Sequence, residues 1–196
     1  MTHEGSKQAL HGALDVVTHL LDWNEGRANN HCRFVSEYAE KTARALDLSD
    51  EDCDAAKTAG LLHDIGIMAL PIEARKKPVY EMTREELDSY HQHPVLGEMA
   101  LSQGVGLEMV AKITRAHHEK LDGSGFPEGL FAKDINKVTR IVSVVADYHD
   151  LYHGLLEKQR LGHYDARQVL LKQRGKAYER EAVDTFLGVL GDDHAE

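Results

Sequence analysis

Residues 28–64 read ANNHCRFVSEYAEKTARALDLSDEDCDAAKTAGLLHD. In the first half of this stretch apolar side chains recur every three or four residues, which predicts an amphipathic helix over about 28–46. Ser49 is a typical helix N-cap and predicts a second helix that runs to about Asp64. We expect Gly66 to end that second helix, because glycine readily adopts the left-handed conformation found after helices.

The same helical period continues through the rest of the chain. Thr83 followed by Glu86 predicts a capping box, and Pro94 either interrupts that helix or starts the next one. No stretch alternates with period two, so we expect almost no β-sheet. Further helices are predicted at about 10–21, 107–118, 134–156, 165–173 and 177–190. The sequence therefore predicts an all-α fold, a bundle of about seven to nine helices.

Composition limits the class of protein. The chain has 196 residues, 42% of them hydrophobic, which favours one globular domain. We expect that domain over 28–190, after an N-terminal helical extension (1–27) and before a short tail (191–196). The net charge of −10 argues against binding to duplex nucleic acid. No apolar run is long enough for a membrane helix, and the two cysteines do not form a C-x-x-C pair, so we expect a cytoplasmic protein.

Histidine is unusually abundant, with 13 histidines against 4 Phe, 7 Tyr and 1 Trp. Several histidines and aspartates lie in or beside the apolar stripes of predicted helices, where a buried polar side chain needs a partner. Metal coordination would satisfy them together, and such imidazole and carboxylate ligands suit Mn, Fe, Ni or Zn. The candidates are His31, the pair His63-Asp64, His93, the pair His117-His118, and Asp147.

Three strings of the sequence resemble the HD-GYP family, which belongs to the HD superfamily. They are His63-Asp64-Ile65-Gly66, His117-His118-Glu119 and Asp122-Gly123-Ser124-Gly125-Phe126-Pro127, and the later Arg140-Ile141-Val142, Ala146-Asp147 and Asp150 also match. Their order and spacing match too, over roughly 28–190. The resemblance implies an all-helical, metal-dependent phosphodiesterase that hydrolyses cyclic di-GMP or a related cyclic dinucleotide.

The resemblance also implies roles for individual residues. His31, His63, Asp64 and Asp147 would hold one metal ion, and His93, His117 and His118 would hold a second. Asp64 would bridge the two ions, and together with His63 it is the expected catalytic centre. A water activated between two divalent ions, Fe or Mn with Ni and Zn as alternatives, would attack phosphorus. Expected substrate-binding residues are Lys120, Asp122, Gly125, Phe126, Pro127, Lys158 and Arg160.

Several positions depart from the family pattern. Ile67 stands where the family usually has a lysine, and Phe126 stands where the loop usually has tyrosine. Some family members bind a third ion through a glutamate one turn before the first histidine. Arg27 occupies that position here, so we expect two ions.

The phosphate-binding positions after Asp147 also differ. Leu156 and Gln159 replace the arginine and the basic residue that the family commonly has there. Lys158 and Arg160 are neighbours that could substitute, although a shift of one residue on a helix rotates a side chain by about 100°.

Other residues have simpler interpretations. His149 and His153 have the i, i+4 spacing of a zinc pair, but without a third ligand we expect a solvated face. Cys32 is expected to pack in the core, and Ser124 to be a turn residue rather than a nucleophile. Surface positions are expected for His3, His11, His19, His91, His163 and His194.

Three functions from different classes remain open at this point. The first is a cyclic dinucleotide phosphodiesterase. The second is a degenerate signalling module that keeps the metals and binds a nucleotide or a partner protein, with input from that partner, from ligand level or from homo-oligomerisation. The third is a di-iron oxygenase of the HD type, against which the loop over 122–127 argues.

Overall fold

The computed structural model describes residues 12–14, 16–21, 30–75, 77–154, 156 and 160–191. This part of the chain is built from helices and contains no β-strand, only two isolated bridges, so the predicted all-α class is confirmed. Residues 12–14 and 16–21 are helical. The later elements are α2 (His31–Ala45), α3 (Asp50–Leu62), η1 (Ile65–Ala69), α4 (Ile72–Arg75), η2 (Val79–Glu81), α5 (Arg84–Tyr90), α6 (His93–Leu101), α7 (Glu108–Ala116), η3 (Ala132–Asp134), α8 (Lys137–His153), α9 (His163–Gln173) and α10 (Arg180–Leu190).

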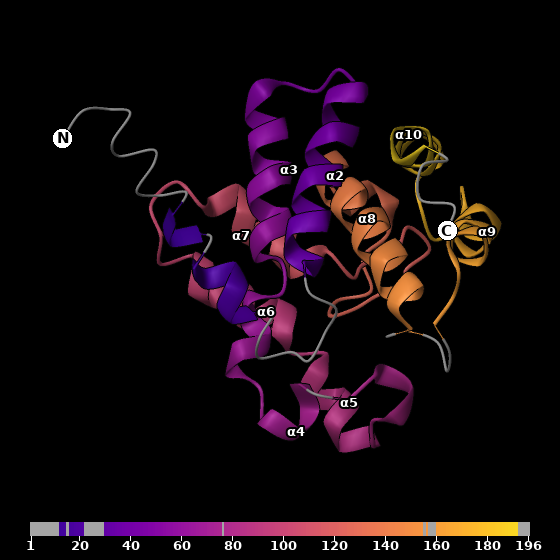
Figure 1. Ribbon diagram of the computed structural model, residues 1–196. Coiled ribbons are helices and arrows are strands. Elements are labelled where there is room, and N and C mark those ends of the chain that lie inside the picture. The colour runs from indigo at the N-terminus through magenta and orange to yellow at the C-terminus, as the bar shows by residue number, and fades with distance from the viewer. Residues whose placement is uncertain are drawn as a thin grey trace.

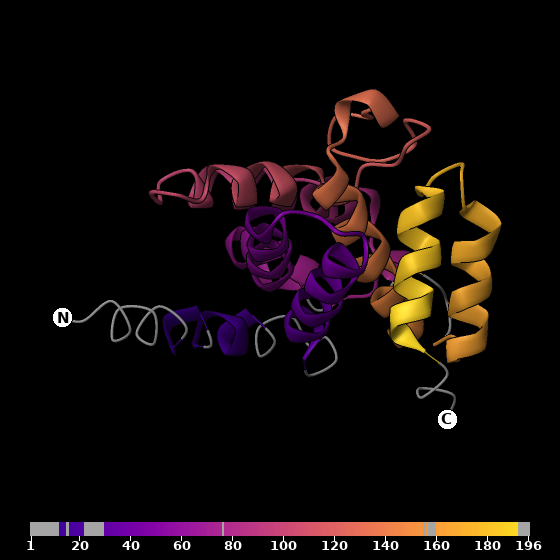
Figure 2. The same cartoon turned by 90° about the horizontal axis from the view of Figure 1, so that it is seen from above.

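Helix α8 lies at the centre of the molecule. It packs against α2, α3, α7, α9 and α10, and Figure 1 shows it beside the antiparallel pair α2 and α3. From Val138 to Leu151 all but one of its residues are buried, so the helix is enclosed on nearly every side. On the far side of α8, α9 and α10 lie side by side (Figure 2). A helix so enclosed holds polar side chains away from water wherever they occur in its sequence.

Most predicted helix ends agree with the structure. Ser49 caps α3 by accepting a hydrogen bond from the backbone N–H of Asp52. Thr83 and Glu86 form the predicted capping box at the start of α5, and Pro94 stands in the first turn of α6. Local side-chain chemistry therefore determines where these helices begin.

The prediction for Gly66 was wrong. Helix α3 already ends at Leu62, and Gly66 lies inside η1 without a left-handed conformation. A Cβ atom at Gly66 would lie 1.9 Å from the carbonyl oxygen of His93, so glycine is needed for close approach of η1 to α6. This contact brings the end of α3 next to the start of α6.

No helix in the described ranges is both long and apolar enough to cross a membrane. The expected boundaries after residues 27 and 190 adjoin residues outside those ranges and stay predictions. Both cysteines are buried and neither is joined in a disulfide, and Cys32 packs in the core as expected.

Candidate metal centre

Six polar side chains meet where four helices begin or end. His31 and His93 are the first residues of α2 and α6, while His63 and His117 directly follow α3 and α7. All six residues are buried, with at most 5% of their surface exposed. The six are His31, His63, Asp64, His93, His117 and His118, so six of the seven candidate ligands share one buried site.

Asp64 lies between two sets of histidines. Its Oδ1 is 3.3 Å from Nε2 of His93 and 3.6 Å from Nε2 of His117. Its Oδ2 is 3.3 Å from Nε2 of His63 and 3.6 Å from Nε2 of His31. Each carboxylate oxygen therefore faces its own histidine pair, which is the arrangement of a carboxylate that bridges two cations.

Three of the histidines are oriented by the backbone. Each brings Nδ1 to the carbonyl oxygen three residues earlier, in the last turn of a helix, where carbonyls lack a partner within the helix. The pairs are His63 with Gly60 at 2.9 Å, His93 with Tyr90 at 2.7 Å, and His117 with Thr114 at 2.6 Å. A carbonyl can only accept, so Nδ1 carries a proton and Nε2 of each ring is turned toward Asp64.

Burial affects the charge of these imidazoles. It lowers the pKa of His117 to about 4, and, with His117 and His93 nearby, it lowers the pKa of His118 well below its ordinary value. Burial acts in the same direction on His63, but the adjacent Asp64 carboxylate outweighs it and raises the pKa of His63. Neutral imidazole is the form that binds metal ions, so His117 and His118 are ready for coordination at neutral pH.

The donor set fits two transition metal ions. One group consists of Asp64, His93, His117 and His118, and a second of His31, His63 and Asp64; within each group the ligand atoms lie within 4.8 Å of one another. Among the described residues, the buried Nε2 of His118 has no hydrogen-bond partner. A buried polar atom without a partner is costly, and a bound ion would satisfy it. Nitrogen-rich groups with a shared carboxylate suit Mn, Fe, Ni or Zn better than Mg or Ca.

Asp147, the seventh candidate, is placed beside these groups and not within them. Its carboxylate pairs with the ammonium group of Lys120 and accepts a hydrogen bond of 2.7 Å from the hydroxyl of Tyr178. Nδ1 of His118 is 4.0 Å from Asp147 Oδ1. The cation of Lys120 is thereby held at the edge of the candidate metal centre.

The expectation of a solvated face for His149 was wrong. His149 is 5% exposed, and with Asp150 and His31 it forms a third group of potential ligand atoms. His153 is half-buried, with its ring centroid 4.3 Å from that of His149. The i, i+4 spacing gave no indication of burial, because the helix carrying both residues is enclosed by its neighbours.

His91 is also not a free surface residue as expected. It is half-buried and stacks on Phe126 with ring centroids 4.1 Å apart. Phe126 also stacks on His118, with ring centroids 4.5 Å apart, so its ring contacts both histidines. Of the other expected surface histidines, His19 is exposed and His163 is half-buried, and the remaining three lie outside the described residues.

The glycine-rich loop is held against the centre by Glu119. This buried carboxylate accepts hydrogen bonds from the backbone N–H groups of Glu128 at 2.7 Å and Leu130 at 2.8 Å. A Cβ atom at Gly125 would lie 2.4 Å from the carbonyl oxygen of His118, so only glycine allows the loop to approach this closely. The backbone N–H of Phe126 donates to that same carbonyl.

Ile67 and Phe126, which both depart from the family pattern, pack in the same apolar cluster. Ile67 is 1% exposed and belongs to a small apolar cluster with Leu70 and Tyr90, against which Phe126 packs. The position where a lysine was expected therefore faces apolar side chains. Ile67, in place of lysine, and Phe126, in place of tyrosine, therefore contribute to the same apolar contacts.

The remaining substrate-binding candidates are spread out. Asp122 and Ser124 are exposed, and Asp122 accepts hydrogen bonds from the Ser124 backbone and hydroxyl, which makes Ser124 the turn residue expected. Arg160 lies over the ring of Tyr152 at 4.6 Å, and Leu156 packs against the main core. Arg27, Lys158 and Gln159 lie outside the described residues.

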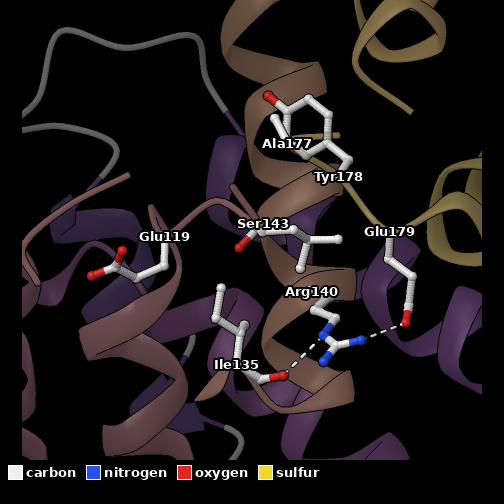
Figure 3. A pocket seen from close by; sticks show the side chains of 8 residues that line it. Glu119, Ile135, Arg140, Ser143, Ala177, Tyr178 and Glu179 are labelled. Carbon is white, nitrogen blue, oxygen red and sulfur yellow. Dashed lines mark hydrogen bonds and ion pairs between the residues drawn. The ribbon is translucent and has the colours of Figure 1, made fainter. Parts of the chain in front are cut away.

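Figure 3 shows a small cavity that is lined in part by Glu119, Ser143 and Tyr178. Its volume of about 10 Å³ is on the scale of a single water molecule, and Arg140 and Glu179 line it with an ion pair at 2.6 Å. Ser143 and Tyr178, also in its wall, donate hydrogen bonds to the His117 carbonyl and to Asp147. This cavity is too small for a nucleotide, and two residues of its wall hold candidate ligands in place through these hydrogen bonds.

A family model described as an HD domain matches residues 15–182. A cyclic di-GMP phosphodiesterase response regulator of Xanthomonas campestris pv. campestris is 30% identical over 176 residues, covering 89% of this chain and 46% of that protein. A 3′3′-cGAMP-specific phosphodiesterase of Vibrio cholerae is 28% identical over 178 residues, covering 88% and 34%. The chain thus spans about half or less of the length of these relatives.

Solved structures share the fold. A protein of Bdellovibrio bacteriovorus described as an HDG"Y"P protein superposes with a TM-score of 0.68 at 22% identity, covering 82% of this chain and 51% of that one. A cyclic GMP-AMP specific phosphodiesterase of Vibrio cholerae gives a TM-score of 0.72 at 15% identity, covering 92% and 48%.

Proposed function

Because the chain belongs to the HD-domain family, we propose that it is a metal-dependent phosphodiesterase that hydrolyses cyclic di-GMP or a related cyclic dinucleotide. Its relatives are named for action on cyclic di-GMP and on 3′3′-cGAMP, so the proposal covers both kinds of substrate. The observation that carries the proposal is the position of Asp64. Its two oxygens face two buried histidine groups, which is what a two-ion phosphoester site requires.

Two divalent transition ions, Fe or Mn with Ni or Zn as alternatives, would lower the pKa of a water held between them and neutralise charge on phosphorus. We assign the seven predicted ligands to them, with Asp147 joining from the edge of the site. His63 and Asp64 would form the centre of the site. The backbone contacts at Nδ1 keep the Nε2 atoms of these imidazoles pointed inward, where they would bind the ions.

The residues around the centre would bind and orient the substrate. The ammonium group of Lys120 lies beside Asp147 at the edge of the site. There it would donate a charge-assisted hydrogen bond to a phosphate oxygen of the substrate. Phe126 offers a ring next to His118, and the loop over 122–127 would border the substrate. Lys120 would then replace the lysine that position 67 lacks.

The test is product formation from cyclic di-GMP and, separately, from 3′3′-cGAMP, followed by chromatography. Protein purified without oxygen and loaded with Fe or Mn is compared with Asp64→Ala. Linear dinucleotide or mononucleotide from the wild type, absent with the variant, is the expected result. Intact substrate in the presence of two bound ions per chain would refute the proposed activity.

A second candidate function rests on Ile67. Its burial among apolar side chains removes one cation from the surroundings of the site, as expected of a module that binds a nucleotide or a partner protein without cleaving it. The same experiment separates the two functions, because a binding module retains its metals and leaves both substrates intact. Turnover at an ordinary enzymatic rate would exclude the second function.

The proposal extends to the location of the protein in the cell and to its partners. We propose a cytoplasmic signalling role, supported by two buried cysteines that form no disulfide and by the response-regulator relative. Input from a separate partner protein or from homo-oligomerisation fits such a role. The acidic net charge favours a small ligand over duplex nucleic acid.

A further inference from the structure

His31 differs from three of the other candidate ligands in how its ring is oriented. His63, His93 and His117 each bring Nδ1 to a backbone carbonyl at the end of a helix. Nδ1 of His31 lies 2.9 Å from Nδ1 of a second side chain, that of His149. Its Nε2 lies on the opposite side, 3.0 Å from Nε2 of His63.

Two Nδ1 atoms at hydrogen-bond distance share one proton, and its position determines what His31 can do. If His31 carries the proton on Nδ1, its Nε2 presents a lone pair to Asp64. If His149 donates instead, a neutral His31 has its proton on Nε2 and cannot bind an ion there. Oδ1 of Asp150, 3.5 Å from Nδ1 of His31, attracts the N–H group of the first arrangement, and Oδ2 of Asp64, 3.6 Å from Nε2, attracts that of the second. An ion beside Asp64 would remove the second attraction.

We propose that His149 is a positioning residue that keeps the proton of His31 on Nδ1, and so directs Nε2 of His31 toward the metal centre. The inference rests on the proposed function to the extent that His31 is a metal ligand. A histidine that binds a metal commonly donates its other ring N–H to an acceptor, which fixes the tautomer and the ring plane. Here that acceptor is an imidazole.

The surroundings of His149 hold its ring in place for this role. It projects from the enclosed helix α8, and its ring contacts those of Phe34 at 4.6 Å and His31 at 4.8 Å between centroids. The His31 and His149 rings are tilted by 66°, an edge-on approach in which nitrogen meets nitrogen. A packed ring of this kind loses little conformational freedom when it accepts the hydrogen bond.

Because this acceptor is a side chain, a single substitution can remove it. Asparagine at position 149 places a carbonyl oxygen close to the site of Nδ1, whereas leucine fills similar space without an acceptor. His153, one turn further along α8 and half-buried, provides the matched control. The variants are therefore His149→Asn, His149→Leu and His153→Leu.

Mn²⁺ binding is measured by titration calorimetry and by metal analysis of the dialysed proteins. We expect His149→Leu to lower the affinity for one of the two Mn²⁺ ions by about 10-fold to 100-fold. This is the range found when the hydrogen-bond partner of a ligating histidine is removed. His149→Asn and His153→Leu are expected to stay within about 3-fold of the wild type. Nitrogen-15 NMR of metal-free protein should show His31 protonated on Nδ1 in the wild type and in His149→Asn.

Three results would overturn the inference. They are unchanged Mn²⁺ binding in a folded His149→Leu protein, Nε2 protonation of His31 in the wild type, or a third ion that both position-149 variants lose. The last result would make His149 a ligand. Absence of bound Mn²⁺ in the wild type would refute the proposed metal site instead, while the NMR measurement would still locate the proton of His31.

Discussion

Phe126 stacks on His118 with ring centroids 4.5 Å apart and an interplanar angle of 24°. Phe126 also stacks on His91, with ring centroids 4.1 Å apart. Phe126 therefore joins the glycine-rich loop to a candidate ligand and to the segment before α6. The contact between loop and ligand depends on the ring itself, since phenylalanine has no hydroxyl to contribute.

Replacing Phe126 should separate the role of its ring from that of the tyrosine hydroxyl. Phe126→Ala removes two ring stacks and should lower the free energy of unfolding by about 1–3 kcal/mol. Phe126→Tyr keeps both stacks and should stay within about 0.5 kcal/mol of the wild type. Urea denaturation of metal-free protein measures both values, and equal losses in the two variants would contradict the stacking role.

Glu119 should control the order of the loop through its two backbone hydrogen bonds. In Glu119→Gln one acceptor oxygen becomes an NH₂ group, so either the Glu128 or the Leu130 N–H loses its partner. The expected cost is about 1–3 kcal/mol. Hydrogen exchange at Glu128 and Leu130 should accelerate about 10-fold or more, while exchange within α8 should not.

Glu108→Gln is the matched control, because Glu108 is exposed on the first turn of α7. In this variant the rates of hydrogen exchange at Glu128 and Leu130 should equal those of the wild type. Unchanged loop exchange in Glu119→Gln would show that Glu119 is not the anchor.

Ile67 tests whether this site could accept the family's lysine as a single change. Ile67→Lys places a cation in the cluster formed with Leu70 and Tyr90, and it should lower the free energy of unfolding by more than about 2 kcal/mol. Ile72→Lys provides the comparison, because Ile72 is 51% exposed and should tolerate the same change. Equal urea midpoints for the two variants would show that position 67 reaches water.

Local sequence chemistry was sufficient to predict the helices, but not to group the candidate ligands. Ser49 and Thr83 cap helices by bonds to residues three positions away, so the sequence alone identifies them. The resemblance grouped histidines that spacing alone could not bring together. Six of the seven predicted ligands converge, because the ends of α3 and α7 meet the starts of α2 and α6.

The remaining features depend on packing between distant segments. His149 was predicted to be solvated, because periodicity within one helix does not show that neighbouring helices enclose it. Asp147 pairs with Lys120, 27 residues away, and Gly66 is required by a carbonyl of another helix. No short-range pattern in the sequence contains such contacts.

Asp64 should be needed for both ions, since each of its oxygens faces a different histidine group. Asp64→Ala should lower Mn²⁺ affinity at both positions by more than about 100-fold, beyond the effect of removing an outer partner. His93→Ala, which removes a ligand from one group, should lose one ion and retain the other. Asp54→Ala, at an exposed position on α3, should bind like the wild type. Metal analysis after dialysis gives the number of ions per chain, and one ion retained by Asp64→Ala would exclude the bridging role.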